Sequence, residues 1–206
     1  MFNTKRIKNG LKRRFIWALN GFPADQPMLE MVWSFGMIPS KMEVPHGYIL
    51  RQFKPEDKEQ HTSLMERVGM GYCALDFWEK KILPSGFYVV EDKKSKTIVA
   101  TCFASHNPSS RHPAGGNLGW LAVDPQHEGL GLGRLVSTLV TKRLVDGHYR
   151  NIYLETHDHR LPAIKIYLSL GWVPLIYDRT MAQRWKNICR ALNFNLDIIK
   201  DDKVKS

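Results

Sequence analysis

The sequence has few cysteines and no long apolar run. Three of its 206 residues are cysteines, widely separated and without a C-x-x-C pair: Cys73, Cys102 and Cys189. An odd number of isolated cysteines argues against a disulfide framework and favours free or buried thiols in a reducing cytosol, so we expect a cytoplasmic protein. No stretch reaches the roughly 18 apolar residues that span a bilayer. The apolar part of the N-terminal segment, Phe15 to Leu19, is too short for a secretory signal.

Acidic residues are scarce, above all near the N-terminus. The chain has 30 Lys and Arg against 20 Asp and Glu, a formal net charge of +10. The first acid is Asp25, and the basic residues before it are Lys5, Arg6, Lys8, Lys12, Arg13 and Arg14. A basic arm over residues 1–22 suits nucleic acid, anionic lipid or another polyanion, and a plain solvated extension is the alternative. Positive charge elsewhere also suits a ligand that carries several phosphates.

The chain has no internal repeat or low-complexity tract, and its pattern changes near residue 45. Before that point the prolines of "FPADQP" and "MIPSKMEVP" interrupt any long helix, and "LEMVWSFGMI" between them is expected to pack as a short helix. We expect four parts: a basic extension on or flanking the core (1–45), a core domain (46–177), a docked C-terminal helix (178–199) and a frayed tail (200–206).

From Gly47 onward strands and helices alternate. Strand patterns are expected at 48–54, in a hairpin over 87–107 around "EDKKSK", at 116–124, 151–157 and 172–178. Helical patterns cover 55–68, 74–83, 132–146, 161–170 and 181–192, with Pro162 in a first turn and Gly171 past a helix end. This order indicates an α/β (α+β) domain with a mixed, mostly antiparallel sheet and helices on both faces.

The segment "LAVDPQHEGLGLGRLVSTLV" joins a strand to a helix through three glycines, Gly129, Gly131 and Gly133. The first N–H groups of a helix lack partners and lie at the positive end of its dipole, and glycines let an anion approach that backbone. The dinucleotide fingerprint fails because Arg134 stands where its third glycine belongs. The nucleoside-triphosphate loop fails because Gly133 is followed by Arg134 and Leu135. A phosphate-binding turn of another kind is therefore predicted, with a ligand-free flexible turn as the alternative.

Two motifs resemble the GNAT N-acetyltransferase superfamily. "VDPQHEGLGLGRLV" resembles its pyrophosphate-binding motif, and "PAIKIYLSLGW" resembles its later A-x-x-x-Y-x-x-x-G-F/W segment. The resemblance covers residues 47–177 and implies the GNAT acyltransferase fold with acetyl-CoA as co-substrate. Glu128 departs from the Q/R of the motif, and Arg160 stands where some members carry Asn. The cofactor-binding residues implied are Leu121, Ala122, Val123, Gly129, Leu130, Gly131, Leu132, Gly133, Arg134 and Arg160.

The same resemblance places Tyr167 beside the thioester sulfur as the acid. A tyrosine with its ordinary pKa near 10 stays protonated at neutral pH and can protonate a thiolate. Glu155, on the strand "IYLET", is the expected general base, and a water relay without a single base is the alternative. The neighbouring side chains of "HDH" at 157–159 point to opposite sides if extended, so no metal site is expected.

The main hypothesis is an acetyl-CoA-dependent N-acetyltransferase that transfers the acyl group directly to a small-molecule or peptide amine. One alternative is a non-catalytic acyl-CoA-binding module whose basic arm recruits a polyanionic partner. A nucleic-acid-binding protein led by residues 1–22 is the third hypothesis. A homodimer is compatible with each. His106, Arg111 and His112, in the loop "HNPSSRHPAGGN", are candidates for lining the acceptor side.

Overall fold

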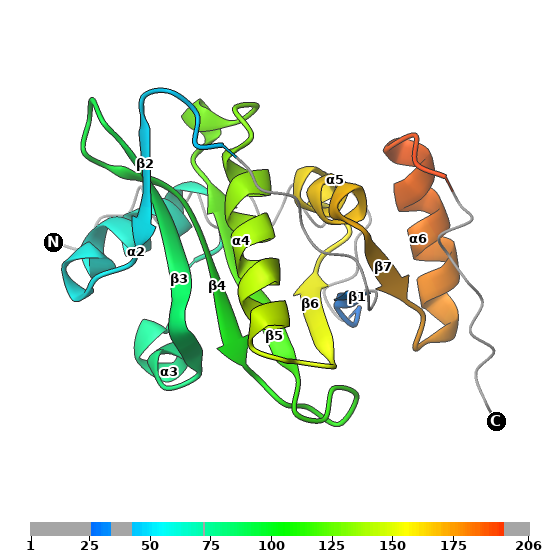
Figure 1. Ribbon diagram of the computed structural model, residues 1–206. Coiled ribbons are helices and arrows are strands. Elements are labelled where there is room, and N and C mark those ends of the chain that lie inside the picture. Colours follow the sequence, from blue (N-terminus) through cyan, green and yellow to red (C-terminus); the bar gives the residue numbers. More distant parts are fainter. Residues whose placement is uncertain (1–25, 34–42, 72, 196–206) are drawn as a thin grey trace, which may run out of the picture.

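The computed structural model describes residues 26–33, 43–71 and 73–195, which contain one seven-stranded sheet (Figure 1). The strand order is β2-β3-β4-β5-β6-β1-β7. All neighbouring pairs are antiparallel except β5 and β6, so the expected mixed, mostly antiparallel sheet is confirmed. The strands are β1 (Leu29–Trp33), β2 (Tyr48–Gln52), β3 (Ile82–Asp92), β4 (Ile98–His106), β5 (Gly116–Val123), β6 (Ile152–Thr156) and β7 (Trp172–Leu175).

Helices cover both faces of the sheet, as the sequence predicts. The helices α4 (Leu132–Asp146), α5 (Leu161–Leu170) and α6 (Arg179–Ala191) bury their apolar side chains in one core. The helices α2 (Lys58–Arg67) and α3 (Leu75–Glu79) contribute to a second core with β3, β4 and β5. Single 3-10 turns precede α2 (Pro55–Asp57) and follow β5 (Pro125–His127). Figure 1 shows α4 and α5 side by side across the middle of the sheet.

Local signals fix the ends of α5 and the orientation of α6. Pro162 lies in the first turn of α5, and Gly171 ends it with φ +96°, a left-handed conformation that glycine adopts without strain. On α6, Trp185 and Ile188 are buried against the sheet as their spacing predicts. These boundaries matter because α5 carries Tyr167 into the core.

The helix expected in "LEMVWSFGMI" is wrong for residues 29–33, and the rest of that segment lies outside the described residues. Residues 29–33 form β1, which pairs with β6 on one side and with β7 on the other. Leu29, Met31 and Trp33 are buried in the core with α5 and α6, whereas Glu30 points to the opposite face. This alternation has a period of two, which a strand satisfies and a helix does not. The segment is therefore an internal strand of the sheet rather than part of an extension packed on it.

The second departure lies before the hairpin. The helix expected over 74–83 ends at Glu79, and Ile82 already belongs to β3. Pro84 to Gly86 interrupt the pairing of β3 with β4 by a register shift, where Ser85 has φ +54°. The basic arm over residues 1–22 lies outside the described residues. In the described part of the chain, no helix combines the length and apolarity that crossing a membrane requires.

Candidate functional site

The sheet opens between β5 and β6. These parallel strands are paired only where Gly116–Leu118 of β5 lie beside Ile152–Leu154 of β6, and both strands continue beyond this stretch. β5 also shifts register against β4, and Trp120 at this bulge has φ +57°, which is rare for a non-glycine residue. A bulge bends its strand and redirects the following backbone groups. Residues 121–123 consequently border the opening instead of pairing with β6.

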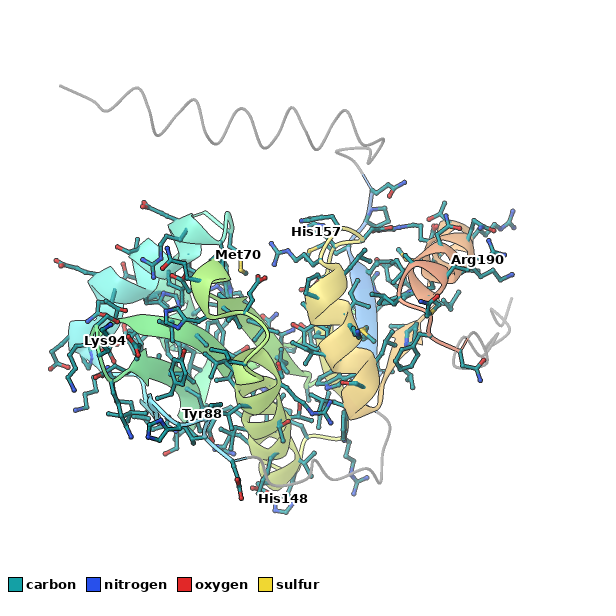
Figure 2. The ribbon with its side chains drawn as sticks, turned by 90° about the horizontal axis from the view of Figure 1, so that it is seen from above. Met70, Tyr88, Lys94, His148, His157 and Arg190 are labelled. Carbon is teal, nitrogen blue, oxygen red and sulfur yellow. The ribbon has the colours of Figure 1, made fainter. Side chains whose placement is uncertain are left out.

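A cavity of about 620 Å³ lies beside residues 121–123 of β5, between the glycine turn and α5. In Figure 2, Met70, which follows α2, lies on the α4 side of the molecule, and His157, in the loop before α5, lies on the α5 side. The cavity is lined from both sides, and most of the residues predicted to bind the cofactor are among its walls. The predicted residues that line it are Leu121, Ala122, Val123, Gly129, Gly131, Leu132, Gly133, Arg134 and Arg160. Leu130 lies outside the lining and is 47% exposed.

The three glycines of the turn have two different roles. Gly129 and Gly131 have φ +78° and +79°, and a Cβ on either would meet no atom within 4 Å. They are needed for the left-handed backbone. Gly133 belongs to α4, and its Cβ would lie 2.9 Å from Cδ1 of Ile166. Gly133 therefore allows α4 to pack closely on α5 and also lines the cavity, so the expectation that the three glycines provide access for a ligand stays a prediction.

The start of α4 is open to an anion. Its N-cap, Gly131, provides no side-chain hydrogen bond, and the first turn contains no acid. The first N–H groups of the helix therefore keep their partial positive charge. Arg134 donates to Oγ of Ser169 at 2.6 Å, which links the first turn of α4 to the last turn of α5. Basic side chains predominate in the lining, where Arg134, Arg160 and Lys165 accompany the acid Glu128.

Asp124, which precedes the turn, holds it in place through two contacts. Its carboxylate accepts a hydrogen bond from the backbone N–H of Gln126 at 3.0 Å and pairs with Nε of Arg67, the last residue of α2, at 2.7 Å. Arg67 and Asp124 were not predicted as site residues. Asp124 before Pro125 is a local N-cap signal, but its ion pair with α2 spans 57 residues. The pair fixes the end of α2 relative to the turn.

Tyr167 lies deeper than the residues that line the cavity. It is only 5% exposed, packs 6.2 Å from Trp172 between ring centroids, and does not border the cavity. Its hydroxyl makes no hydrogen bond with another described residue. Burial raises the pKa of Tyr167 above its ordinary value, and the thiol of Cys102 adds to this effect. The phenol therefore stays protonated throughout the neutral range.

Glu155 lies on the other face of the sheet. It pairs in register with Glu30 of β1, on the face turned away from the core that contains Ile152 and Leu154. Glu155 keeps contact with solvent, yet the protein partly desolvates its carboxylate. That desolvation and the negative charge of Glu30 both raise the pKa of Glu155. A carboxylate with a raised pKa is a better proton acceptor near neutral pH.

Glu30 is the centre of a cluster that the sequence did not reveal. It is 2% exposed, accepts a hydrogen bond from Nε of Arg111 at 3.0 Å, and lies 2.7 Å from Nε2 of His112. Arg111 also stacks on the ring of Tyr177 at 4.0 Å, and His112 stacks on Tyr153 at 3.9 Å. Two candidates for the acceptor side thus meet beside Glu155. The third, His106, lies apart from them and contacts Tyr149 at 3.0 Å.

The histidines of "HDH" do not assemble a metal site. His157 and His159 stack on each other with ring centroids 5.5 Å apart, and Asp158 instead pairs with Arg184. In the part of the chain that the structure describes, no three His, Cys, Asp or Glu side chains come together as a set of ligands.

Comparison with known proteins gives the family. A segment of 89 residues, 43% of this chain, is 28% identical to a mycothiol acetyltransferase of Arthrobacter sp. (strain FB24) and spans 28% of that protein. A GCN5-related N-acetyltransferase from Sphaerobacter thermophilus superposes with a TM-score of 0.55 at 17% identity, covering 80% of this chain and 53% of its own. The structure of the NatC complex bound to Gag peptide and CoA superposes with a TM-score of 0.53 at 18% identity. The match covers 65% of this chain and 92% of the NatC chain. Residues 49–172, more than half of the chain, match the model of the acetyltransferase (GNAT) family, and the chain belongs to that family.

Proposed function

We propose that the chain is an acetyl-CoA-dependent N-acyltransferase that transfers the acyl group directly from the thioester to an amine. The observation that carries this proposal is the uncapped start of α4, which opens with Arg134 into the cavity beside β5 and α5. Unpartnered N–H groups at the positive end of a helix dipole suit a diphosphate. The NatC structure was solved with CoA, which supports this class of ligand.

The residues present fit CoA. Positions 129–134 would hold the diphosphate, and the main-chain groups of 121–123 would lie along the pantetheine arm. The cavity volume of about 620 Å³ falls in the range of pockets that bury most of a ligand of this size. When bound, the CoA thioester supplies an acyl group that is activated toward amines.

The chain's own residues supply the proton steps. Glu155 takes a proton from the acceptor amine, because its raised pKa makes it a base near neutral pH. Tyr167 keeps its proton, because burial raises its pKa, and its hydroxyl donates toward the departing sulfur. The cluster of Glu30, Arg111 and His112 forms one wall of the acceptor side.

A non-catalytic acyl-CoA-binding module is the second candidate, and one observation favours it. Tyr167 is buried and does not border the cavity, so catalysis requires its hydroxyl to become accessible to the ligand. A module that only binds CoA needs no such access.

Thiol release decides between the two. The full chain is incubated with acetyl-CoA and a panel of amino sugars, amino acids, polyamines and peptides, and free CoA is measured with a thiol reagent. Background is low because all three cysteines are buried and burial raises their pKa. The enzyme hypothesis predicts release with at least one amine. Tyr167→Phe should reduce turnover about tenfold or more without changing CoA affinity, whereas Tyr149→Phe serves as the matched control and changes neither.

Silence across the panel, with saturable CoA binding, supports the module and removes the enzymatic proposal. Full turnover by Tyr167→Phe under conditions where chemistry limits the rate removes the role of Tyr167 alone.

A further inference from the structure

Arg160 is a partly buried cation that no described acid neutralises. Its guanidinium forms no hydrogen bond or ion pair with a residue that the structure describes, and the adjacent acid Asp158 is already held by Arg184 at 2.9 Å and 2.5 Å. Burial lowers the pKa of Arg160, the opposite of Arg51, whose pKa is raised by hydrogen bonds to Asp57. An unpaired charge removed from water is unfavourable unless an anion joins it. The side chain is therefore arranged for an anion that the described residues do not supply.

The position of Arg160 separates it from the diphosphate. It is the N-cap of α5 and lines the cavity, whereas Ser169, the partner of Arg134, lies in the last turn of the same helix. Nine residues of helix correspond to about 13 Å at 1.5 Å per residue. The N–H groups at the start of α4 lie beside the later turns of α5, where Gly133 approaches Ile166, whereas Arg160 is the N-cap of α5 and is placed for another negative group of the same ligand.

Tyr167 identifies which group that is. It lies seven residues after Arg160, two turns along the same side of α5, and helical side chains lean toward the N-terminus of their helix. The phenol therefore extends toward Arg160, and the charge of Arg160 acts on the pKa of Tyr167. In the proposed reaction the hydroxyl of Tyr167 donates to the sulfur, so the sulfur would lie near the start of α5.

We propose that Arg160 is the counter-ion of the CoA thiolate. This inference rests on the proposed function and deepens it. As the amine nitrogen forms its bond to the acyl carbon, the carbon–sulfur bond breaks and sulfur keeps the electron pair. The guanidinium then stabilises the negative sulfur electrostatically, while the hydroxyl of Tyr167 donates a hydrogen bond to it. The proton lost by the amine passes to Glu155, and the thiolate takes a proton from water after release.

The other groups around Arg160 do not duplicate its charge. His157 and His159, from the same loop, are held mainly neutral because burial lowers the pKa of both, that of His159 to about 4. Arg184 of α6 is paired with Asp158. Tyr167 of α5 and Cys102 of β4 are neutral, since burial raises the pKa of each. Arg134 and Lys165 also line the cavity, and the comparison of wild type with Arg160→Gln separates the contribution of Arg160 from theirs.

The test measures the thiol pKa of bound CoA, without any acceptor. CoA is titrated with pH on the full chain, its thiolate is followed by ultraviolet absorbance, and desulfo-CoA provides the blank. We expect binding to lower the thiol pKa by about one unit or more relative to free CoA. Arg160→Gln should return it to the free value, and Arg160→Lys should restore most of the decrease. The cysteines of the chain add no thiolate signal near neutral pH, because burial raises their pKa.

An unchanged thiol pKa in both wild type and Arg160→Gln overturns the inference and leaves the proposed function intact. The same holds if Arg160→Gln weakens CoA and desulfo-CoA equally without moving the thiol pKa, because Arg160 then holds another part of the carrier. No binding of either compound to the wild-type chain removes the proposed function itself.

A second measurement needs no variant. The affinity of the wild-type chain for CoA should rise with pH through the thiol pKa, while the affinity for desulfo-CoA stays level. Parallel profiles for the two compounds contradict the inference, even if Arg160→Gln does not fold.

Discussion

The turn at 128–134 and the cluster around Glu30 are built in different ways. The turn uses backbone N–H groups and left-handed glycines that are neighbours in the chain. The cluster uses side chains from β1, from the loop before β5 and from β6. Two of them, Glu30 and Arg111, are more than 80 residues apart in the sequence. The turn therefore depends on local conformation, whereas the cluster depends on the register of the sheet.

The largest expected effect comes from Glu30→Ala. Glu30 is 2% exposed, and its loss leaves Arg111 and His112 without their acceptor. Breaking a buried pair costs about 3–5 kcal/mol, and the half-exposed Arg111 moves the expected loss to the lower end, about 3 kcal/mol. Urea unfolding measures the loss. Because the turn is independent of this cluster, CoA affinity of the folded variant should change less than about twofold.

The matched control for this prediction is Asp146→Ala, which removes an ion pair with Lys142 whose two side chains are each 52% exposed. Its expected cost is below about 1 kcal/mol. If both variants lose the same small amount of stability, the cluster is not a structural link between β1 and the loop.

Substitution of His61 tests whether the loss of folding stability at low pH arises at the site or in the core packed against α2. Its ring is fully buried near Phe53 and Phe87, neither nitrogen has a partner, and burial lowers its pKa from 6.5 to about 4. The unfolded chain therefore binds more protons than the folded chain between about pH 6.5 and 4, so stability falls as the pH falls through that range. His61→Phe should remove up to about 3 kcal/mol of this decrease.

Unfolding curves at several pH values, with the exposed His46→Gln as control, measure this contribution. Equal pH dependence of wild type and His61→Phe would place the acid-sensitive groups elsewhere, with the histidines at 157 and 159 beside the cavity as the next to examine.

The turn side is tested by Gly131→Val and Gly131→Asn. Gly131 has φ +79° with open space around it, so the substitution strains the backbone without a clash. A left-handed conformation costs an ordinary residue about 1–2 kcal/mol, and a β-branched one more, while Asn tolerates it. We expect Val to weaken CoA binding about tenfold and Asn to weaken it less than about threefold. Equal affinities for both variants would show that the left-handed turn does not organise the diphosphate site.

The smallest expected effect is a shift in one pKa. Glu30→Gln removes the negative charge that raises the pKa of Glu155, and it releases the positive Arg111, which lowers that pKa. The pKa of Glu155 should therefore fall, which a carbon NMR titration of labelled glutamate carboxyls measures without an acceptor. A pKa that stays constant or rises would mean that the two carboxylates do not interact across β1 and β6.

The turn side was predicted from the sequence because its causes are local. The strand before Pro125, the glycines and the helix after them occupy one continuous segment. Eight of the nine predicted ligand-binding residues that line the cavity belong to it, and the ninth, Arg160, is the N-cap of α5. The sequence did not predict the packing role of Gly133. Its neighbour Ile166 lies 33 positions later, so only the packing of α4 on α5 reveals why a Cβ does not fit.

The place of Glu30 beside Arg111 and His112 was not predicted because β1 pairs with strands more than 100 residues away. The segment "LEMVW" is too short to distinguish a helix from a strand by periodicity. The one sign of a strand in this segment is that the acid Glu30 stands between the apolar residues Leu29 and Met31. Such alternation indicates that Glu30 lies on the face of the sheet opposite the apolar core. Its partners Arg111 and His112 follow from the loop conformation, which the sequence alone does not specify.

The most direct test of the account is a calorimetric titration of the full chain with CoA and, separately, with pantetheine, which lacks the diphosphate. The account predicts saturable binding of CoA and far weaker binding of pantetheine, because the open start of α4 holds the diphosphate. Absence of heat from CoA at millimolar concentration, or equal affinity for the two compounds, would contradict it.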